Sequence, residues 1–214
     1  MRAIIFSGGT YGDIEHCREY IDGADLVIAA DGGGMVLFRL EALPDIVIGD
    51  MDSIGKGELE SFQKGGVEII TRPRDKDYTD TELAFDLAID RGSDEIIILG
   101  ALGARMDHAL ANLSLLVKGA DKGIKTTVID ERQELLILPP KIKNRLDGKP
   151  GDTISLVSLS EKTEKVTTND LKYPLSDGTL TLLSPLGVSN EISGPDPWVS
   201  YETGRLLLVV VKKV

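Results

Sequence analysis

The sequence contains a single cysteine, Cys17, so it has no second thiol with which to close a disulfide within the chain. Its first residues, MRAIIFSGGTYGD, include an apolar run too short for a signal peptide, and no run reaches the length that spans a bilayer. Low-complexity tracts and internal repeats are also missing from the sequence. These absences predict a globular, cytoplasmic protein with no membrane association.

Histidine and aromatic residues are scarce as well. The two histidines, His16 and His108, do not stand with Cys17 at the spacing of a zinc site. Aromatic residues make up 5% of the chain, which leaves few side chains to cover a flat organic ligand. No segment matches G-x-x-x-x-G-K-[ST], so a Walker-type phosphate loop is excluded.

Basic residues are outnumbered, because 24 lysines and arginines face 35 aspartates and glutamates, for a net charge of −11. Proteins that bind nucleic acid usually carry a basic surface that neutralises phosphates, so the sequence argues against this class. The acidic field favours a cationic substrate. A polyanionic substrate would need a metal ion or a local basic cluster to offset that field.

The first part of the chain alternates between β-branched segments and segments with helical spacing. The predicted strands are 2–8, 24–31, 45–50, 67–72, 94–100 and 125–130, and the predicted helices are 13–22, 56–66, 80–92 and 107–119. This alternation predicts an α/β domain with a doubly wound, largely parallel sheet over residues 1–140. Strand-like segments then follow one another without helices, which predicts an all-β, sandwich-like domain over 141–214.

Acidic residues follow several of the predicted strands, at the edge where open parallel sheets bind ligands. Asp50 and Asp52 stand one residue apart, and an extended backbone between them would point both side chains to one face. Like charges that close disfavour each other's ionised form, so a cation is expected between them. The further acids are Asp31, Asp75, Asp77, Asp80 and Asp107. Oxygen ligands of this kind are suited to Mg²⁺.

The same acids also have structural interpretations. Asp50 and Asp52 are residues that commonly form turns through bonds to nearby backbone amides. Thr79 and Glu82 have the spacing of a capping box, which would place Asp80 in the first turn of a helix, where negative charge is favourable.

Two glycine-containing turns are candidates for binding phosphate. In GALGARMDHA (100–109), small residues let backbone amides approach an anion, and Arg105 and a helix N-terminus follow. The segment SGGTYGD (7–13) offers a similar turn between a strand and a helix. In the structural alternative, Asp107 is an ordinary N-cap and His108 is a surface residue of the first helical turn.

Five segments occur in the order seen in thiamine pyrophosphokinases, and the chain most resembles the bacterial members of that family. They are AADGGG (29–34), GDMDS (49–53), DKDYTDTELA (75–84), GALGARMDHALAN (100–112) and SPLGVSNEI (184–192). The family transfers the diphosphoryl group of ATP to thiamine, giving thiamine diphosphate and AMP, and requires Mg²⁺. The resemblance therefore implies a nucleotide-binding catalytic domain, a thiamine-binding β domain and a homodimer with shared active sites.

The resemblance also implies roles for individual residues. Catalysis is assigned to Asp50, Asp52, Asp80 and Arg105; Mg²⁺ binding to Asp50, Asp52 and Asp80; nucleotide binding to Asp31, Gly32, Gly33, Gly103, Arg105 and Asp107; and thiamine binding to Lys76, Thr79 and Asp80. Because the α/β half has few aromatic residues to cover a flat cation, we further expect Ser189, Asn190 and Trp198 of the β half to complete the thiamine site. Asp80 would act on the thiamine hydroxyl or ligate the metal, and the sequence leaves both roles open.

Alternatives remain at the level of function and of single residues. The same acidic crevice would serve a pyrophosphokinase that acts on another heterocyclic alcohol, or a non-catalytic sensor of nucleotide or thiamine. Trp198 has two interpretations, packing between sheets or stacking on a ligand ring. Ser189 and Asn190 have the composition of a β-turn as well as that of a hydrogen-bonding site.

Overall fold

The computed structural model describes residues 1–73, 77–103 and 105–212, which form two compact units, Met1–Glu131 and Arg132–Val214. Lys76, one of the residues predicted to bind thiamine, lies outside the described residues, as does Asp75. Within the described part of the chain, no helix is both long and apolar enough to cross a membrane.

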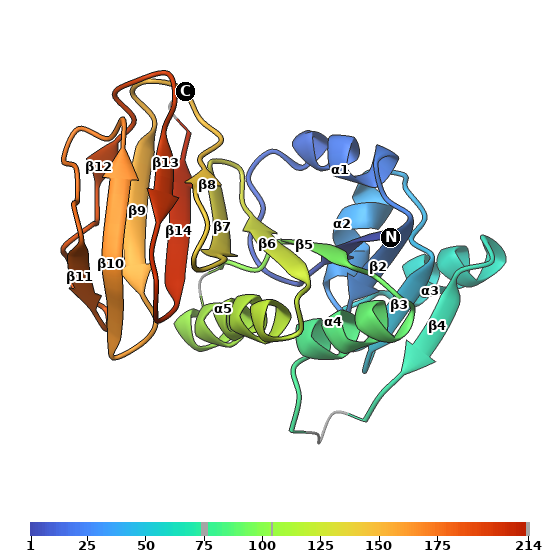
Figure 1. Cartoon of the computed structure of the whole chain (residues 1–214). Helices are drawn as coiled ribbons and strands as arrows, with labels where there is room; N and C mark the ends of the chain where they lie inside the picture. The colour runs from blue at the N-terminus through green and yellow to red at the C-terminus, as the bar shows by residue number, and fades with distance from the viewer. Residues whose placement is uncertain (74–76, 104, 213–214) are drawn as a thin grey trace. The chain divides into compact units, whose positions relative to one another are not determined.

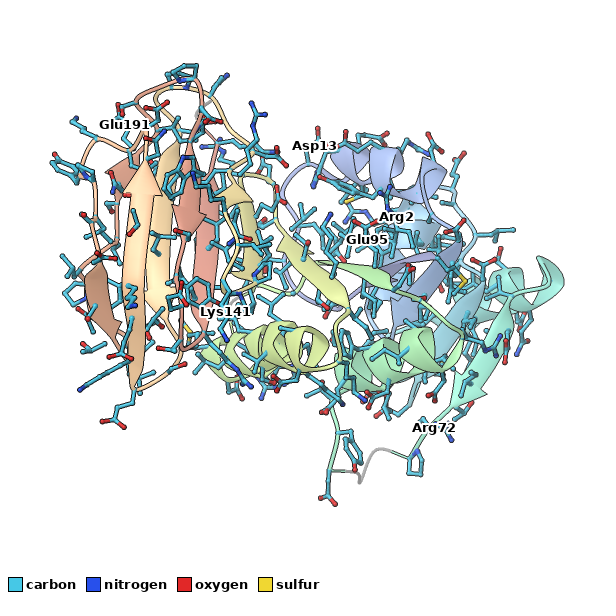
Figure 2. The ribbon with its side chains drawn as sticks, viewed as in Figure 1. Arg2, Asp13, Arg72, Glu95, Lys141 and Glu191 are labelled. Atoms are coloured by element: carbon cyan, nitrogen blue, oxygen red, sulfur yellow. The ribbon has the colours of Figure 1, made fainter. Side chains whose placement is uncertain are left out.

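The first unit is built on six parallel strands in the order β6-β5-β1-β2-β3-β4. Their bounds are β1 (Arg2–Phe6), β2 (Leu26–Ala30), β3 (Ile46–Gly49), β4 (Glu68–Thr71), β5 (Glu95–Leu99) and β6 (Lys125–Ile129). All six predicted strands are confirmed. The central strands are buried along almost their whole length, as expected for apolar, β-branched runs with helices over both faces. Arg2 and Glu95, which are partners in the register of β1 and β5, also bond through their side chains, with Arg2 Nε donating to Glu95 Oε2 at 2.8 Å (Figure 2).

Helices cover both faces of this sheet, with α1 and α2 on one side and α4 and α5 on the other (Figure 1). The helical elements are the 3₁₀ turn η1 (Ile14–Cys17) and the helices α1 (Arg18–Asp22), α2 (Gly33–Arg39), α3 (Lys56–Lys64), α4 (Asp80–Asp90) and α5 (Met106–Asp121). The four predicted helical segments are confirmed, whereas α2 was not predicted. It begins with two glycines, which are poor helix formers, so its stability comes from burial of Val36 and Leu37 in the core.

The second unit consists of two antiparallel sheets, ordered β12-β9-β14-β7 and β11-β10-β13-β8. The strands are β7 (Gln133–Leu138), β8 (Asn144–Arg145), β9 (Thr153–Ser158), β10 (Lys162–Asn169), β11 (Gly178–Thr181), β12 (Asn190–Glu191), β13 (Trp198–Ser200) and β14 (Leu206–Val211). Burial alternates along β9, and its inward side chains share one core with residues of β10 and β13 from the other sheet. The predicted all-β, sandwich-like region is confirmed.

The strand β7 belongs to this second unit, because it pairs along its whole length with β14. The compact units therefore divide between Glu131 and Arg132, ahead of the sequence-based boundary at residue 140. The assignment of nucleotide binding to one domain and of thiamine binding to the other stays a prediction.

Candidate active site

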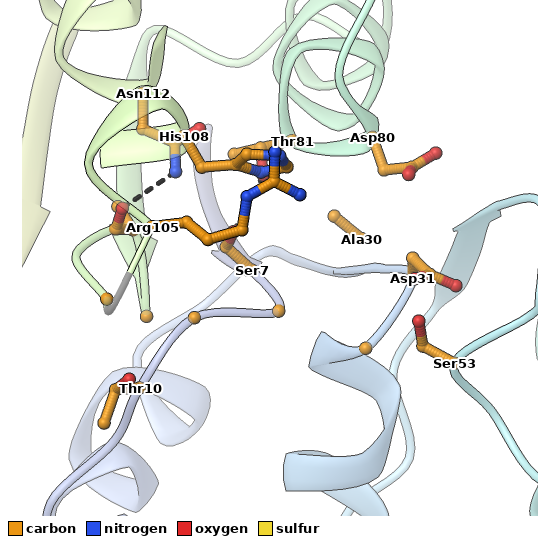
Figure 3. A pocket seen from close by; sticks show the side chains of 16 residues that line it. Ser7, Thr10, Ala30, Asp31, Ser53, Asp80, Thr81, Arg105, His108 and Asn112 are labelled. Atoms are coloured by element: carbon orange, nitrogen blue, oxygen red, sulfur yellow. Dashed lines mark hydrogen bonds between the residues drawn. The ribbon is translucent and has the colours of Figure 1, made fainter. Parts of the chain in front are cut away.

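A cavity of about 420 Å³ lies in the first unit, beyond the C-terminal ends of β1, β2 and β5. Figure 3 shows Asp31, Ser53 and Asp80 on one side and Arg105, His108 and Asn112 on the other. The lining residues are Ser7, Gly8, Gly9, Thr10, Ala30, Asp31, Gly32, Ser53, Asp80, Thr81, Gly100, Ala101, Gly103, Arg105, His108 and Asn112. This is the edge at which open parallel sheets bind ligands.

A cluster of carboxylates lies beside this cavity. Oxygen atoms of Asp31, Asp50 and Asp52 all lie within 4.8 Å of one another. Asp31 Oδ1 is buried and has no hydrogen-bond partner among the described residues. Burial raises the pKa of Asp31, hydrogen bonds from Ser53 oppose this, and the nearby charges of Asp80 and Asp50 raise it further. Carboxylates this close to one another favour a cation between them.

The chain turns sharply between Asp50 and Asp52, so the extended backbone considered from the sequence is wrong. Met51 adopts a left-handed conformation with φ +64°, and the Asp52 N–H donates to Asp50 Oδ1 at 3.1 Å. Ser53 Oγ donates in turn to Asp52 Oδ1 at 3.0 Å. Both carboxylates therefore form a turn, as in the structural interpretation, and this turn still brings them to Asp31.

Gly49 makes room for two carboxylates to approach the end of β3. A Cβ atom added to this residue would lie 3.0 Å from Asp31 Cβ and 3.2 Å from Asp80 Oδ1, at a backbone φ of +152°. Asp80 begins α4, and the preceding Thr79 accepts a hydrogen bond from the Glu82 N–H at 3.1 Å. The predicted cap at Thr79 is confirmed, and Asp80 also faces the cavity (Figure 3).

Two turns form the opposite wall with exposed backbone, one after β1 and one after β5. The N–H of Gly9 donates to the carbonyl of Gly100 at 3.0 Å, and the N–H of Thr10 donates to the carbonyl of Leu102 at 3.2 Å. Both predicted glycine turns therefore line the same cavity. The predicted nucleotide-binding residue Gly103 belongs to the second turn.

Arg105 occupies the N-cap position of α5 and extends to the cavity. Its Nε and Nη2 donate to the two oxygens of Asp107 at 3.2 and 2.6 Å, and this pairing lowers the pKa of Asp107 to about 2. The suggested N-cap role of Asp107 is wrong, because it lies inside the first turn. Both side chains are about two-thirds exposed, so the guanidinium remains within reach of a phosphate.

Sequence reasoning missed several polar residues of the cavity wall. The buried hydroxyls of Ser7 and Thr81 lie 2.7 Å apart, and Asn112 Nδ2 donates to the Ala101 carbonyl at 2.8 Å. His108 is exposed in the first turn of α5, as expected, and also lines the cavity. Its spacing of four residues from Asn112 is a signal that both lie on one helical face. No local pattern connects Ser7 with Thr81.

Other predicted site residues lie elsewhere. Gly33 is buried in the first turn of α2, where an added Cβ would collide with the carbonyl of Phe6, and it is not among the described residues that line the cavity. Gly32 and Asp31 do line the cavity. The DGGG segment thus contributes its first residues to the cavity and its third to packing against β1.

The remaining predicted thiamine-binding residues belong to the second unit. Asn190 is buried, and its amide bonds to the N–H and carbonyl of Tyr173 at 3.0 and 2.7 Å. Ser189 is exposed and has a φ of +59°. The Trp198 ring carries the Lys143 ammonium 4.5 Å from its centroid, so one face already has a cation–π partner. Asn190 is therefore chiefly a structural residue of its loop, while Ser189 and Trp198 remain partly accessible.

Comparison with known proteins gives consistent matches over both units. Residues 17–128 match the family model described as thiamin pyrophosphokinase, catalytic domain, and residues 140–206 match thiamin pyrophosphokinase, vitamin B1 binding domain. The curated thiamine pyrophosphokinase of Bacillus subtilis (strain 168) is 32% identical over 205 residues, which cover 96% of each chain.

Solved structures agree with these sequence matches. A crystal structure of thiamine pyrophosphokinase from Bacillus subtilis matches with a TM-score of 0.89 and 30% identity over 100% of both chains. That of a thiamin pyrophosphokinase from Geobacillus thermodenitrificans has a TM-score of 0.83 and 27% identity, covering 100% of this chain and 98% of the other. The chain belongs to the thiamine pyrophosphokinase family.

Proposed function

We propose that this chain transfers the diphosphoryl group of ATP to the hydroxyl of thiamine, giving thiamine diphosphate and AMP. The observation that carries the proposal is the arrangement of the cavity, where clustered carboxylates face two glycine turns and Arg105. This cavity lies within the unit that matches the family's catalytic domain. Transfer of phosphoryl groups depends mainly on positioning and on neutralising charge, which are tasks this arrangement can perform.

The ATP phosphates are assigned to the glycine-turn side of the cavity. Backbone amides near Gly8 and Gly103 can approach phosphate oxygens closely, because neither residue has a side chain. Arg105 adds a charged fork suited to phosphate, which its partner Asp107 holds in a defined orientation. Asp31, Gly32 and Gly33 were expected to contact the nucleotide, and the first two have positions that support this assignment.

Magnesium fits the carboxylate side. The ligand set of Asp31, Asp50 and Asp52 consists of hard oxygen donors, and the buried Asp31 Oδ1 lacks a partner among the described residues. Asp80, predicted as a further ligand, approaches Asp31 across Gly49. When bound, Mg²⁺ supplies positive charge that neutralises the oxygens of the transferred diphosphoryl group. The four carboxylates would hold the ion in a negatively charged site.

Asp80 is the group that we assign to the attacking hydroxyl of thiamine. It faces the cavity from the first residue of α4, and the Thr79 cap fixes this helical turn. A carboxylate there can accept the hydroxyl proton or orient the oxygen for attack on the β-phosphorus. The acidic net charge of the chain, −11, also favours the thiazolium cation of thiamine.

We further propose that the protein is a homodimer with shared active sites, in which the β unit of one chain completes a site begun by Asp80 of the other. Support comes from the resemblance and from the location of Ser189 and Trp198 in the unit that matches the vitamin B1 binding domain. Cytoplasmic localisation stays a prediction of the sequence.

The decisive experiment is product analysis with ATP, Mg²⁺ and thiamine. We expect thiamine diphosphate and AMP in equal amounts, because attack at the β-phosphorus leaves the α-phosphate on adenosine. ADP formed in step with thiamine consumption would indicate a monophosphoryl kinase instead. Turnover of another heterocyclic alcohol in preference to thiamine, or binding without turnover, would support the two alternative functions.

A further inference from the structure

The side chain of Tyr11, in the first glycine turn, bonds to the end of β5, from which the second glycine turn starts. Its hydroxyl donates to the carbonyl oxygens of Ser7 at 2.9 Å and of Leu99 at 3.0 Å, so one proton is shared between the ends of β1 and β5. Burial raises the pKa of Tyr11 well above its ordinary value, which keeps the hydroxyl protonated and able to donate.

The ring of Tyr11 is fixed as firmly as its hydroxyl. It stacks on Phe6 with a centroid distance of 6.3 Å and an interplanar angle of 13°. It also lies directly against Gly100, where an added Cβ would collide with the ring. Gly100 has a φ of +65°, so both its conformation and this contact require glycine.

Tyr11 contacts residues of the cavity wall and is not itself part of that wall. It is not among the described residues that line the cavity, whereas Ser7 and Gly100, whose backbone it contacts, do line it. Backbone hydrogen bonds also join these segments directly, from the Ser7 N–H to the Leu99 carbonyl at 2.9 Å, from the Gly9 N–H to the Gly100 carbonyl at 3.0 Å and from the Thr10 N–H to the Leu102 carbonyl at 3.2 Å. The Tyr11 hydroxyl adds a side-chain bond to this set at the end where the two strands finish.

We propose that Tyr11 is a positioning residue for the reaction, whose hydroxyl, together with the backbone bonds, holds the two turns at a defined spacing so that they are preorganised for the phosphates of ATP. The inference rests on the proposed function only in assigning the phosphates to these turns. Preorganisation matters because a loop that must be ordered by its ligand loses part of the binding free energy to that ordering.

The test is Tyr11→Phe, which keeps the ring against Phe6 and Gly100 and removes only the shared donor. Titration calorimetry with Mg²⁺ present should show that ATP binds about tenfold more weakly. This is the change in Kd expected when ATP binding must order a turn that has lost one hydrogen bond. The Kd of thiamine should change by less than about twofold. Amide hydrogen exchange at Gly9 and Thr10 should accelerate.

Tyr201→Phe is the matched control, because the Tyr201 hydroxyl likewise donates to a backbone carbonyl, that of Leu138, at 2.6 Å in the second unit. It should lower the thermal midpoint without changing the Kd of ATP. The proposal is overturned if Tyr11→Phe leaves the Kd of ATP unchanged, or weakens ATP and thiamine equally.

A second measurement on the wild-type protein covers the case in which Tyr11→Phe does not fold. The amides of Gly9 and Thr10 should be protected from exchange before ATP is added, and exchange as rapid as that of an unstructured loop would contradict preorganisation. These outcomes are separable from the proposed function. A wild-type chain that makes no thiamine diphosphate refutes the function, whereas an active chain whose ATP affinity is insensitive to Tyr11→Phe refutes only the positioning role.

Discussion

The hydroxyl oxygens of Ser7 and Thr81 lie 2.7 Å apart in the buried space between the end of β1 and the first turn of α4. The residue before Thr81 is Asp80, so this contact fixes the helical turn that presents the carboxylate to the cavity. A hydrogen bond between residues more than seventy positions apart thus joins the glycine-turn side of the cavity to its acidic side.

We expect Ser7→Ala to lower the free energy of unfolding by about 1–3 kcal/mol, because it leaves the buried Thr81 hydroxyl without this partner. Urea denaturation measures the change. In a double-mutant cycle, Ser7→Ala with Thr81→Val should cost less than the sum of the single variants, since both polar groups are then removed. Strict additivity would show that the two hydroxyls do not depend on each other.

Neutralising Asp31 should separate stability from metal binding. Asp31→Asn removes a carboxylate whose ionised form is disfavoured by burial and by the charges of Asp80 and Asp50. Without Mg²⁺ the variant should be at least as thermally stable as wild type, yet Mg²⁺ should no longer raise its thermal midpoint. Asp22→Asn, an exposed acid at the end of α1, is the control and should respond to Mg²⁺ like wild type. An equal Mg²⁺ response in Asp31→Asn would refute the metal assignment.

The ion pair at the start of α5 predicts a defined titration. Asp107 should titrate at about 2, and Arg105→Ala should move its pKa towards the usual value of about 3.9. Because the folded-state pKa is lowered, the pair's contribution to stability is present above the usual pKa and is lost as pH falls towards 2. That contribution is small, since both side chains are exposed. Carboxyl NMR tests the assignment, and an identical pKa in both proteins would contradict it.

The shared-site dimer predicts complementation between inactive chains. We expect Asp80→Asn chains mixed with Ser189→Ala, Trp198→Ala chains to regain about a quarter of wild-type activity, because half of randomly formed dimers are mixed and each has one intact site. Asn190 is left unchanged, since its side chain holds the backbone of Tyr173. Mixed dimers without activity, or an active monomer, would rule out shared sites.

The parallel sheet could be predicted because its strands are short β-branched runs between turn residues, and such runs need burial on both faces. The position of the acids followed from the same pattern, since parallel strands end at a common edge. Asp31 and Asp50 end neighbouring strands of that sheet and do lie together.

What could not be predicted depends on contacts between distant segments. The helix α2 begins with two glycines, so its local propensity is poor and tertiary burial of Leu37 decides its structure. Methionine does not favour a left-handed backbone conformation, so the φ of Met51 could not be predicted from its residue type. The turn in which the Asp52 N–H bonds to Asp50 accounts for it. No local pattern singles out Tyr11, because its partner carbonyl at Leu99 is 88 positions away.

Several glycines contribute bare backbone to the cavity wall, and this limits how single substitutions can change the shape of the cavity. Gly9 and Gly100 have no side chain that a substitution could shorten. A Cβ added to Gly9 would collide with the backbone of the second turn, and one added to Gly100 would collide with the ring of Tyr11. A compound that imitates a nucleoside triphosphate would therefore meet a wall that point mutation can hardly reshape. Adaptation of the cavity to another ligand is therefore expected at its exposed rim, at residues such as His108, whereas Arg105 beside it is the side chain we propose for phosphate binding.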